Sequence, residues 1–496
     1  MRYVPIARRG DRTAALLALL LIVVLVAPAG PLRAQSDLEA QRAALRPEFR
    51  NSLPLADYPH YRIIATVNLD AAILHGQEQV LFRNPAAEPI HDLVFRLLPN
   101  ARSIYGGGSM TVERVTLDTT EVAWTLSADG TTMTVPLDPP LAPGEEVEAN
   151  ITFGARIPTR STGYSIFHHS AAITSLSGWF PVLAPYEGGW QAPAIPGVGD
   201  ANHFAASLYE VTLTAPSTHA LASTGVTLST QAEGDATVWR LTSGPARGFA
   251  IALSDRFRVL EAEREGVTIR YHALPGSQTA RAPEVALEIA ADALAAYSRR
   301  FGPYPYTEFD VVETPVSIGG YEFAGMVFVE HSLRTVGSLS QLRFIVAHET
   351  AHQWWFAQVG SDPVGEPWLD ESLATYSTAV YLEETLGLDA AAGMIAYFRG
   401  EGGAPGSGGP ITSSALQFGS WATYRRPVYY QGAQFLVALR SAMGDDAFFS
   451  LLGQYLSTYR FRIARTADFL DLAEQVAGRE LDDLYLAWFG VAEPGA

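Results

Sequence analysis

Two imidazoles and a carboxylate stand close together in the stretch HETAHQWW, which runs from His348 to Trp355. On a helix, His348 and His352 are one turn apart, so their side chains lie on one face with Cβ atoms about 5 to 6 Å apart. Two imidazoles at that separation can share one zinc ion, with Zn–N bonds of about 2.0 to 2.1 Å. Glu349 points around the helix from that face, so it is better placed to hold a metal-bound water and accept its proton.

A catalytic zinc site needs a third protein ligand and an open fourth position. The stretch WLDESLATY supplies a candidate in Glu371, which is separated from His352 by 18 residues. That length lets the first helix end, a turn pass through VGSDPVGEP, and a second helix bring its first turn back to the histidines. Asp370, beside Glu371, is expected to be the N-cap of the second helix. We therefore predict one Zn²⁺ per chain, bound by His348, His352 and Glu371.

The alternative is that both histidines pack in the core without a metal. Unpaired imidazoles in an apolar helix would cost free energy through desolvation, which makes simple core packing unattractive. A structural zinc site usually completes its shell with thiolates, and the chain contains no cysteine. A hydrolytic metal site is therefore the favoured interpretation.

The two stretches together resemble the aminopeptidase N family of gluzincin zinc metallopeptidases. The family pattern is HExxH, then 18 residues, then a Glu within W-L-N-E-G-x-A-x-Y, and this chain keeps that spacing and most of those residues. The resemblance covers roughly residues 56–490 and is strongest from Phe301 to Gly432. It implies hydrolysis of peptide bonds in a peptide or protein substrate, most simply as an aminopeptidase, with Glu349 as the general base.

The stretch GGYEF resembles the family's G-x-M-E-N segment. This resemblance implies that Glu322, with Gly319 and Gly320, binds the substrate and anchors its free α-amine. A carboxylate at a fixed distance from zinc would favour removal of a single residue, because it pairs with the terminal ammonium. Tyr321 and Phe323 replace the usual Met and Asn, so an endopeptidase or restricted peptidase is the alternative on the same site.

The stretch VYYQGAQFL resembles the family's Y-E-K-G segment. Alignment on Gly432 makes Tyr429 the counterpart of the catalytic tyrosine, with Tyr430 as the neighbour that could be confused with it. The resemblance implies that the Tyr429 phenol donates a hydrogen bond to the oxyanion that forms during hydrolysis.

The elements that must carry these residues follow from the hydrophobic patterning. Segments such as YRIIATVNL and LYEVTLTAP alternate between apolar and polar residues, which predicts an N-terminal all-β domain. Apolar residues at helical spacing then predict a mixed, mainly helical catalytic domain, so the fold class is α+β and multidomain. The predicted helices include the whole of QLRFIVAHETAHQWWFAQ, and GEGGAPGSGGP is expected to be a flexible loop.

The resemblance implies a saddle-like shape for the β domain and a thermolysin-like catalytic domain. The C-terminal helical domain of larger family members is expected to be absent, which would leave the cleft more open. The predicted boundaries are a signal peptide at 1–34, a linker at 35–56, a β domain at 57–264 and a catalytic domain at 265–496.

The first 34 residues have the layout of a secretory signal, because arginines precede the uncharged run AALLALLLIVVLVA and small residues follow it. We expect an extracytoplasmic protein, secreted or periplasmic, and membrane attachment only if this segment is uncleaved.

The formal net charge of -18 argues against nucleic-acid partners. The alternative from another functional class is a binding protein without catalytic activity that is displayed at a membrane. Nothing in the sequence indicates an oligomeric state.

Overall fold

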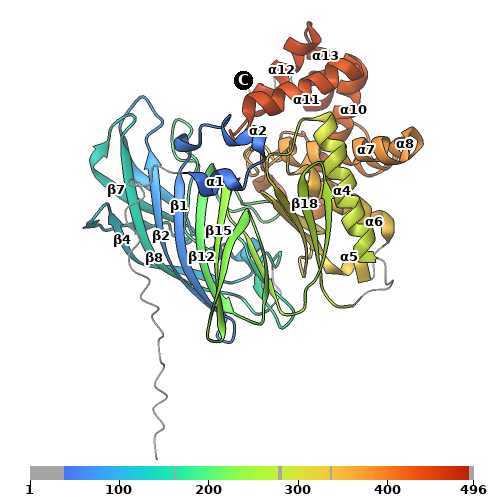
Figure 1. The fold of residues 1–496 in the computed structure, drawn as a ribbon. Coiled ribbons are helices and arrows are strands. Elements are labelled where there is room, and N and C mark those ends of the chain that lie inside the picture. The colour runs from blue at the N-terminus through green and yellow to red at the C-terminus, as the bar shows by residue number, and fades with distance from the viewer. Residues whose placement is uncertain (1–37, 161–162, 277–281, 336–337, 491–496) are drawn as a thin grey trace, which may run out of the picture.

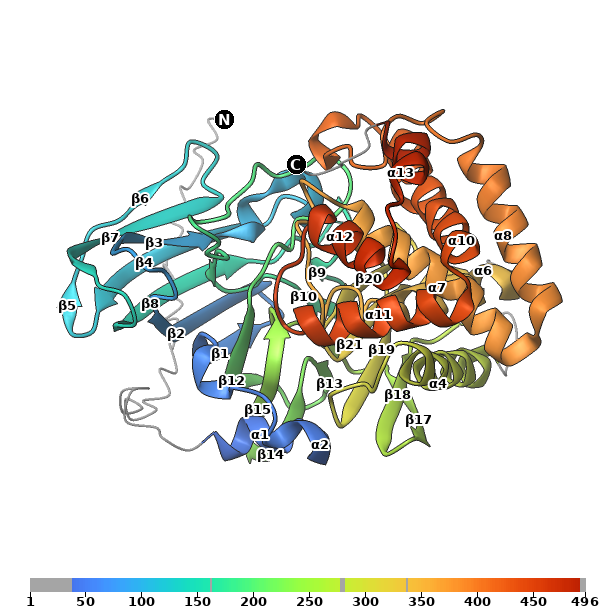
Figure 2. The same cartoon turned by 90° about the horizontal axis from the view of Figure 1, so that it is seen from above.

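The computed structural model describes residues 38–160, 163–276, 282–335 and 338–490. β-sheets occupy one side of the molecule and helices gather on the other (Figures 1 and 2). An all-β N-terminal region is followed by a mixed, mainly helical region, so the predicted α+β class is confirmed. The predicted signal segment, residues 1–34, lies outside the described residues. Within those ranges, no helix combines the length and apolar character needed to cross a membrane.

An eight-stranded sheet forms the body of the β region, with a parallel β1–β12 pair and antiparallel neighbours elsewhere. Its strands alternate buried and exposed side chains, because one face covers the core. The order across the sheet is β14 (Val226–Glu233), β15 (Ala236–Arg247), β12 (Ala206–Pro216), β1 (His60–Asn68), β2 (Ile73–Arg83), β8 (Glu146–Arg156), β4 (Ser109–Leu117) and β5 (Thr120–Glu121).

Two four-stranded sheets complete the β region. One has the order β13 (Ala220–Ser223), β16 (Ile251–Ser254), β10 (Thr174–Leu176) and β9 (Phe167–His169). The other has the order β11 (Val182–Leu183), β3 (Ile90–Arg96), β7 (Thr132–Leu141) and β6 (Thr125–Leu126).

A five-stranded sheet opens the second region and carries the GGYEF stretch at its edge. Its order is β17 (Arg258–Arg264), β18 (Val267–Ala273), β19 (Glu308–Thr314), β21 (Met326–Glu330) and β20 (Gly320–Phe323). β17 pairs with β18 and so belongs to the sheet of the second region. It nevertheless precedes the domain boundary that the sequence predicts between residues 264 and 265.

The remaining elements are helical. In the β region they are α1 (Glu39–Ala43), α2 (Pro47–Arg50), η2 (Leu55–Asp57), η3 (Leu98–Asn100) and α3 (Arg102–Tyr105). In the second region they are α4 (Ala282–Arg300), α5 (His331–Thr335), α6 (Leu339–Ala351), α7 (Trp368–Leu386), α8 (Leu388–Gly402), η4 (Ala415–Gln417), α9 (Trp421–Arg425), η5 (Arg426–Gln431), α10 (Gly432–Met443), α11 (Asp445–Tyr459), α12 (Thr466–Ala477) and α13 (Asp482–Phe489).

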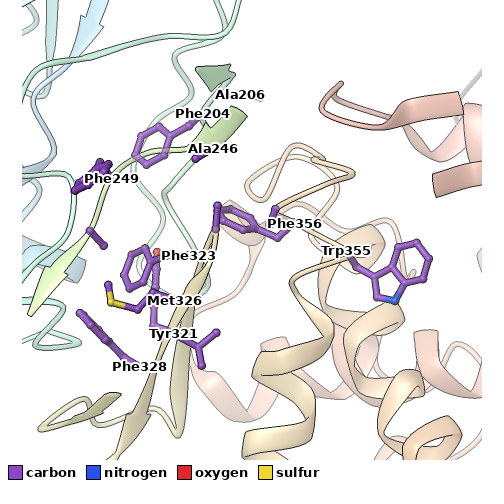
Figure 3. Packing of buried hydrophobic residues seen from close by; sticks show 14 of the residues in the cluster. Phe204, Ala206, Ala246, Phe249, Tyr321, Phe323, Met326, Phe328, Trp355 and Phe356 are labelled. Carbon is purple, nitrogen blue, oxygen red and sulfur yellow. The ribbon is translucent and has the colours of Figure 1, made fainter. Parts of the chain in front are cut away.

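Apolar side chains from the two regions pack into one continuous core. Figure 3 shows Phe204 and Phe249 of the β region on one side of this junction, with Phe323 and Met326 of the five-stranded sheet facing them. Burial of such aromatic groups against each other stabilises the relative placement of the two regions.

A buried arginine joins three chain segments at the same junction. Arg247, the last residue of β15, donates from Nη1 to Phe204 O at 2.8 Å and from Nε to Phe356 O at 2.8 Å. Its Nη2 donates to Arg462 O at 2.6 Å. One guanidinium therefore ties the β region to the loop after the zinc-motif helix and to the loop before α12.

The segment predicted as a linker also packs across this junction. The backbone N of Thr307 donates to Ala44 O at 3.0 Å, and the N of Arg46 donates to Pro305 O at 2.9 Å. Leu45 between them is fully buried. Residues 39–50 therefore cover the boundary between the two regions (Figure 1).

Glu78 is a buried carboxyl on the core face of β2. Its side chain is 1% exposed, and neither of its oxygens has a hydrogen-bond partner among the described residues. Burial raises the pKa of Glu78 well above its ordinary value. The unfolded chain releases this proton at about pH 4.3. Above that pH the folded state binds more protons than the unfolded state, so the free energy of unfolding falls as pH rises toward the raised pKa.

Glu78→Met should therefore stabilise the fold by about 1 to 3 kcal/mol or more, because it removes an unpartnered buried polar group. Denaturant unfolding should show that the substitution increases the free energy of unfolding more at pH 8 than at pH 5.5. Gln77→Met, on the exposed face of the same strand, is the control and should leave the pH dependence unchanged. An equal gain at both pH values would contradict the assignment.

Candidate metal centre

The zinc-motif helix, α6, begins with a reciprocal cap. Gln341 N donates to Ser338 Oγ at 3.1 Å, while Ser338 N donates to Gln341 Oε1 at 2.9 Å. The helix ends at Ala351, and His352 is its C-cap. The predicted continuation to Gln358 is wrong, because residues 352–358 form a series of turns instead. Both histidines still face the same side, since they remain one turn apart.

The three predicted ligands meet at one point. His352 Nε2 lies 3.1 Å from His348 Nε2, and Glu371 Oε2 lies 3.2 Å from His348 Nε2 and 3.6 Å from His352 Nε2. A tetrahedral zinc ion with bonds of about 2.0 to 2.1 Å requires ligand atoms about 3.3 Å apart. The spacing, the buried imidazoles and the carboxylate therefore fit one zinc ion.

Asp370 orients one of these ligands. Its Oδ1 lies 2.6 Å from His352 Nδ1, and a hydrogen bond donated by Nδ1 leaves the lone pair on Nε2, where the metal would bind. The prediction that Asp370 is an N-cap is wrong: α7 begins at Trp368 after Pro367, which places Asp370 inside the first turn. Thr375 Oγ1 lies 3.5 Å from His348 Nδ1 and can orient that ring in the same way.

The electrostatics of the pocket follow from its burial. Burial lowers the pKa of His348 well below its ordinary value, which keeps this imidazole neutral and able to bind a metal. Burial also tends to lower the pKa of His352, but the Asp370 and Glu322 carboxylates reverse the effect and raise it. Burial raises the pKa of Glu371 to about 7. A divalent cation bound at this place would compensate the Glu371 and Asp370 carboxylates and so favour their ionised forms.

Glu349 lies against Gly320 of the edge strand β20, with a carboxylate oxygen within 4.8 Å of a ring nitrogen of His352. Its Oε2 has no hydrogen-bond partner among the described residues, and burial raises its pKa well above the ordinary value. Gly320 makes room for it, because a Cβ there would lie 2.3 Å from the Glu349 carboxyl carbon. Gly320 lines the pocket, whereas Gly319 makes a turn beside it, with a φ of +100° and its N donating to Glu330 Oε2 at 3.1 Å.

Tyr429 also reaches the ligand group, and Tyr430 does not. The Tyr429 hydroxyl donates to Glu371 Oε1, and its ring stacks on His348 with centroids 5.7 Å apart. Tyr430 instead points to Tyr397, whose hydroxyl lies 3.2 Å from its own. The geometry therefore supports Tyr429 as the candidate for a role in chemistry.

A π-helical turn, η5, carries Tyr429 and is tied to the zinc-ligand helix. Ser372, the residue after Glu371, donates from Oγ to Val428 O at 2.5 Å. The two segments approach so closely that a Cβ at Gly432 would lie 1.7 Å from Ser372 Oγ. The metal ligand and Tyr429 are thus held by directly bonded segments.

The glycine-rich stretch predicted as a flexible loop is anchored to the same turn. Gln431 Nε2 donates to Gly402 O at 2.9 Å, Ala404 O at 2.8 Å and Ser407 Oγ at 3.1 Å. Arg426 Nε also donates to Gly402 O, at 3.2 Å. This part of the loop therefore has a defined place against η5.

Glu322 lies on β20 with its side chain 3% exposed, and it lines the same pocket. Its Oε1 has no hydrogen-bond partner among the described residues. A carboxylate oxygen of Glu322, one of Glu349 and a ring nitrogen of His352 lie within 4.8 Å of one another. Glu322 is thus an unpaired acid within reach of a ligand bound beside the metal.

Asp200 was missed by the sequence reasoning. It comes from the β region and lines the pocket together with Glu322, Glu349 and Glu371. The stretch PGVGDANHF around it shows an acid in a glycine-containing loop but carries no spacing that points to the zinc motif. Only the packing of the two regions brings it to this site.

Comparison with known proteins agrees with this geometry. Residues 285–488 match the Peptidase family M1 domain. Human aminopeptidase B is 30% identical over 190 residues, which are 36% of this chain and 29% of the relative. Aminopeptidase N of Streptomyces lividans is 27% identical over 222 residues, which are 38% of this chain and 24% of the relative.

Residues 285–488 are thus a peptidase family M1 domain, similar to the aminopeptidases of the aminopeptidase N family of gluzincins. The chain spans less than a third of the length of these two family M1 relatives.

Solved structures show the same fold over most of the chain. The M1 zinc metallopeptidase of Deinococcus radiodurans superposes with a TM-score of 0.68 at 22% identity, covering 87% of this chain and 94% of that one. A mutant of that protein bound to a Tyr-Ser-Ala substrate superposes with a TM-score of 0.67 at 20% identity, covering 89% and 95%. The two-region architecture is therefore a family M1 fold.

Asp370→Ala should weaken zinc binding by roughly 10- to 100-fold, because it removes the acceptor that orients His352. Competition with a chelator of known affinity, with metal content measured by mass spectrometry, checks this. Asp370→Asn keeps an oxygen acceptor at the same place, so it should lose less zinc affinity than Asp370→Ala. Wild-type affinity in the alanine variant would show that this hydrogen bond does not orient the ligand.

Proposed function

We propose that this chain is a zinc-dependent aminopeptidase that releases N-terminal residues from peptides. The observation that carries the proposal is the convergence of three metal-ligating side chains, His348, His352 and Glu371, on one pocket that also contains Glu349 and Tyr429. The M1 relatives named aminopeptidases support the same reaction. A protein that only binds peptides would need neither an acid–base group nor a phenol at the metal.

Glu349 is the proposed general base. A zinc ion held by His348, His352 and Glu371 would supply Lewis-acid activation of a water molecule and of the scissile carbonyl. Burial makes the Glu349 carboxylate a stronger base than an exposed glutamate, so it can accept the proton of the attacking water. The same carboxyl can then pass this proton to the leaving amine.

Tyr429 is the proposed oxyanion donor. Burial and the Glu371 carboxylate raise the pKa of its phenol well above the ordinary value, so the hydroxyl keeps its proton at neutral pH. A protonated phenol at the edge of the pocket can donate a hydrogen bond to the oxygen that gains negative charge.

Glu322, with Gly319 and Gly320, is proposed to bind the free N-terminus of the substrate. The unpartnered, buried Oε1 of Glu322 supports this role, because a buried carboxylate is costly unless it meets a positive charge. An ammonium at this place would put the first peptide bond beside the metal.

We also propose that the protein is exported, because residues 1–34 follow the pattern of a secretory signal. N-terminal sequencing of the exported chain would locate the cleavage site.

Glu349→Gln should lower kcat by roughly 10²- to 10⁴-fold, since the amide cannot accept the proton of the attacking water. Zinc content should stay at one per chain, because the three ligands are untouched. Turnover of an aminoacyl fluorogenic substrate, followed with and without a chelator, measures the loss. Near-normal activity in a zinc-loaded Glu349→Gln protein would refute the assignment of the base.

A peptide with a free amine should be cleaved much faster than its N-acetylated twin, because only the former offers an ammonium to Glu322. Glu322→Gln should reduce that preference by roughly 10-fold or more through a higher KM. Equal rates for the two wild-type reactions, measured by mass spectrometry of the products, would instead favour the endopeptidase alternative.

A further inference from the structure

Gln353 is a buried amide that directly follows the zinc-ligand candidate His352 and has no part in the proposed reaction. Its side chain is fully buried, and both ends of the amide are hydrogen-bonded. Nε2 donates to Phe323 O at 2.8 Å, and Oε1 accepts from Gly325 N at 2.8 Å. Loss of either bond would leave a buried polar group unpaired, so the amide holds this segment in one position.

The segment that Gln353 holds is the turn between β20 and β21. Phe323 pairs with Met326 across the turn, and Gly325 between them has a φ of +74°. β20 lies at the edge of the five-stranded sheet, and among the described strands it has a partner on one side only. The side-chain amide therefore adds a second attachment, from the zinc motif, to a strand that the sheet holds from one side.

The other end of β20 also lies against the zinc motif. Gly320 is so close to Glu349 that a Cβ there would lie 2.3 Å from the Glu349 carboxyl carbon. Glu349 and Gln353 are four residues apart in the motif, and Gly320 and Phe323 are the first and last residues of β20. The strand is thus fixed at both ends, and Glu322 lies between the two points.

The backbone of Gln353 is itself anchored. Its N donates to Thr350 O at 3.1 Å, and its O accepts from Gln358 Nε2 at 3.0 Å. Gln358 is also fully buried, and its own O accepts from Phe461 N at 2.5 Å. The series of turns after α6 therefore keeps the Gln353 amide at a defined distance from the hairpin.

We propose that Gln353 is a positioning residue that sets the distance between β20 and the zinc motif. That distance determines where the Glu322 carboxylate lies and how much space Gly320 leaves for Glu349. Gln353 does not line the pocket, so it acts only through these residues. This inference rests on the proposed aminopeptidase function, because a misplacement of about 1 Å in a positioning element can cost a reaction roughly 100-fold.

Gln353→Met tests the proposal, because it keeps the length of the side chain and removes both hydrogen bonds. Gln353→Asn keeps the amide but shortens the side chain, so it cannot hold the hairpin at the same distance. Gln434→Met is the matched control, because this buried glutamine donates from Nε2 to Phe398 O at 3.0 Å and does not line the pocket. Zinc content and thermal unfolding are measured for each variant.

Two measurements on folded, zinc-loaded protein distinguish positioning from a merely structural role. Hydrogen exchange followed by mass spectrometry should be faster in residues 320–326 of Gln353→Met and unchanged in α7. With a free-amine peptide, KM should rise by roughly 10-fold or more in both Gln353 variants and stay unchanged in Gln434→Met. A partly unfolded sample contains fewer active molecules, which lowers the apparent kcat and leaves KM unchanged, so the rise in KM identifies positioning.

A wild-type KM in the folded, zinc-loaded Gln353 variants would overturn the proposal, even if the hairpin exchanges faster. A raised KM without faster exchange in residues 320–326 would also overturn it, because the effect would not pass through β20. If Gln353→Met does not fold, Gln353→Asn decides. Either negative result leaves the aminopeptidase function standing, whereas a zinc-loaded wild-type protein without peptidase activity would refute that function and this inference together.

Discussion

The site depends on gathering negative charge and imidazole nitrogens where water is largely excluded. His348, His352 and Glu371 bring ligand atoms to between 3.1 and 3.6 Å of one another, and Asp370 stands directly behind one of them. Such a cluster is expensive to bury without a cation, so a divalent metal is part of what makes this packing of α6 against α7 favourable. Trp355 Nε1, which donates to Ser377 Oγ at 3.0 Å, ties the end of the zinc motif to α7.

The same close packing determines which side chains surround the metal site. Ser372 joins the ligand helix to the π-helical turn, so the position of Tyr429 follows from the position of Glu371. On the opposite wall, Gly320 gives Glu349 the space it occupies beside β20. The β region completes the pocket with Asp200, and Arg247 bonds that region to the loop following the zinc motif. The pocket is therefore a product of both regions.

The residues closest to the chemistry were predictable because they lie in local patterns. Two histidines one turn apart must share a helix face, and 18 residues are enough for a return on a second helix, so His348, His352 and Glu371 could be named from spacing. The β-then-helical order was equally visible from the change in hydrophobic period. The roles of Glu322 and Tyr429 came from resemblance to the family, and the structure places both at the pocket.

The sequence by itself thus determined which side chains can bind a metal and which elements carry them, because helical and strand periods are local properties. Tertiary structure alone decided that Asp370 supports His352 instead of capping α7, that the glycine-rich stretch is anchored by Gln431, and that Asp200 reaches the pocket. These contacts join residues distant in the chain, and the one made by Asp370 also depends on α7 beginning at Trp368, three residues before the start that an N-cap at Asp370 implies. The first two are set by the packing of helices and loops within the second region, and the place of Asp200 is set by the packing of the two regions against each other; no local pattern records either.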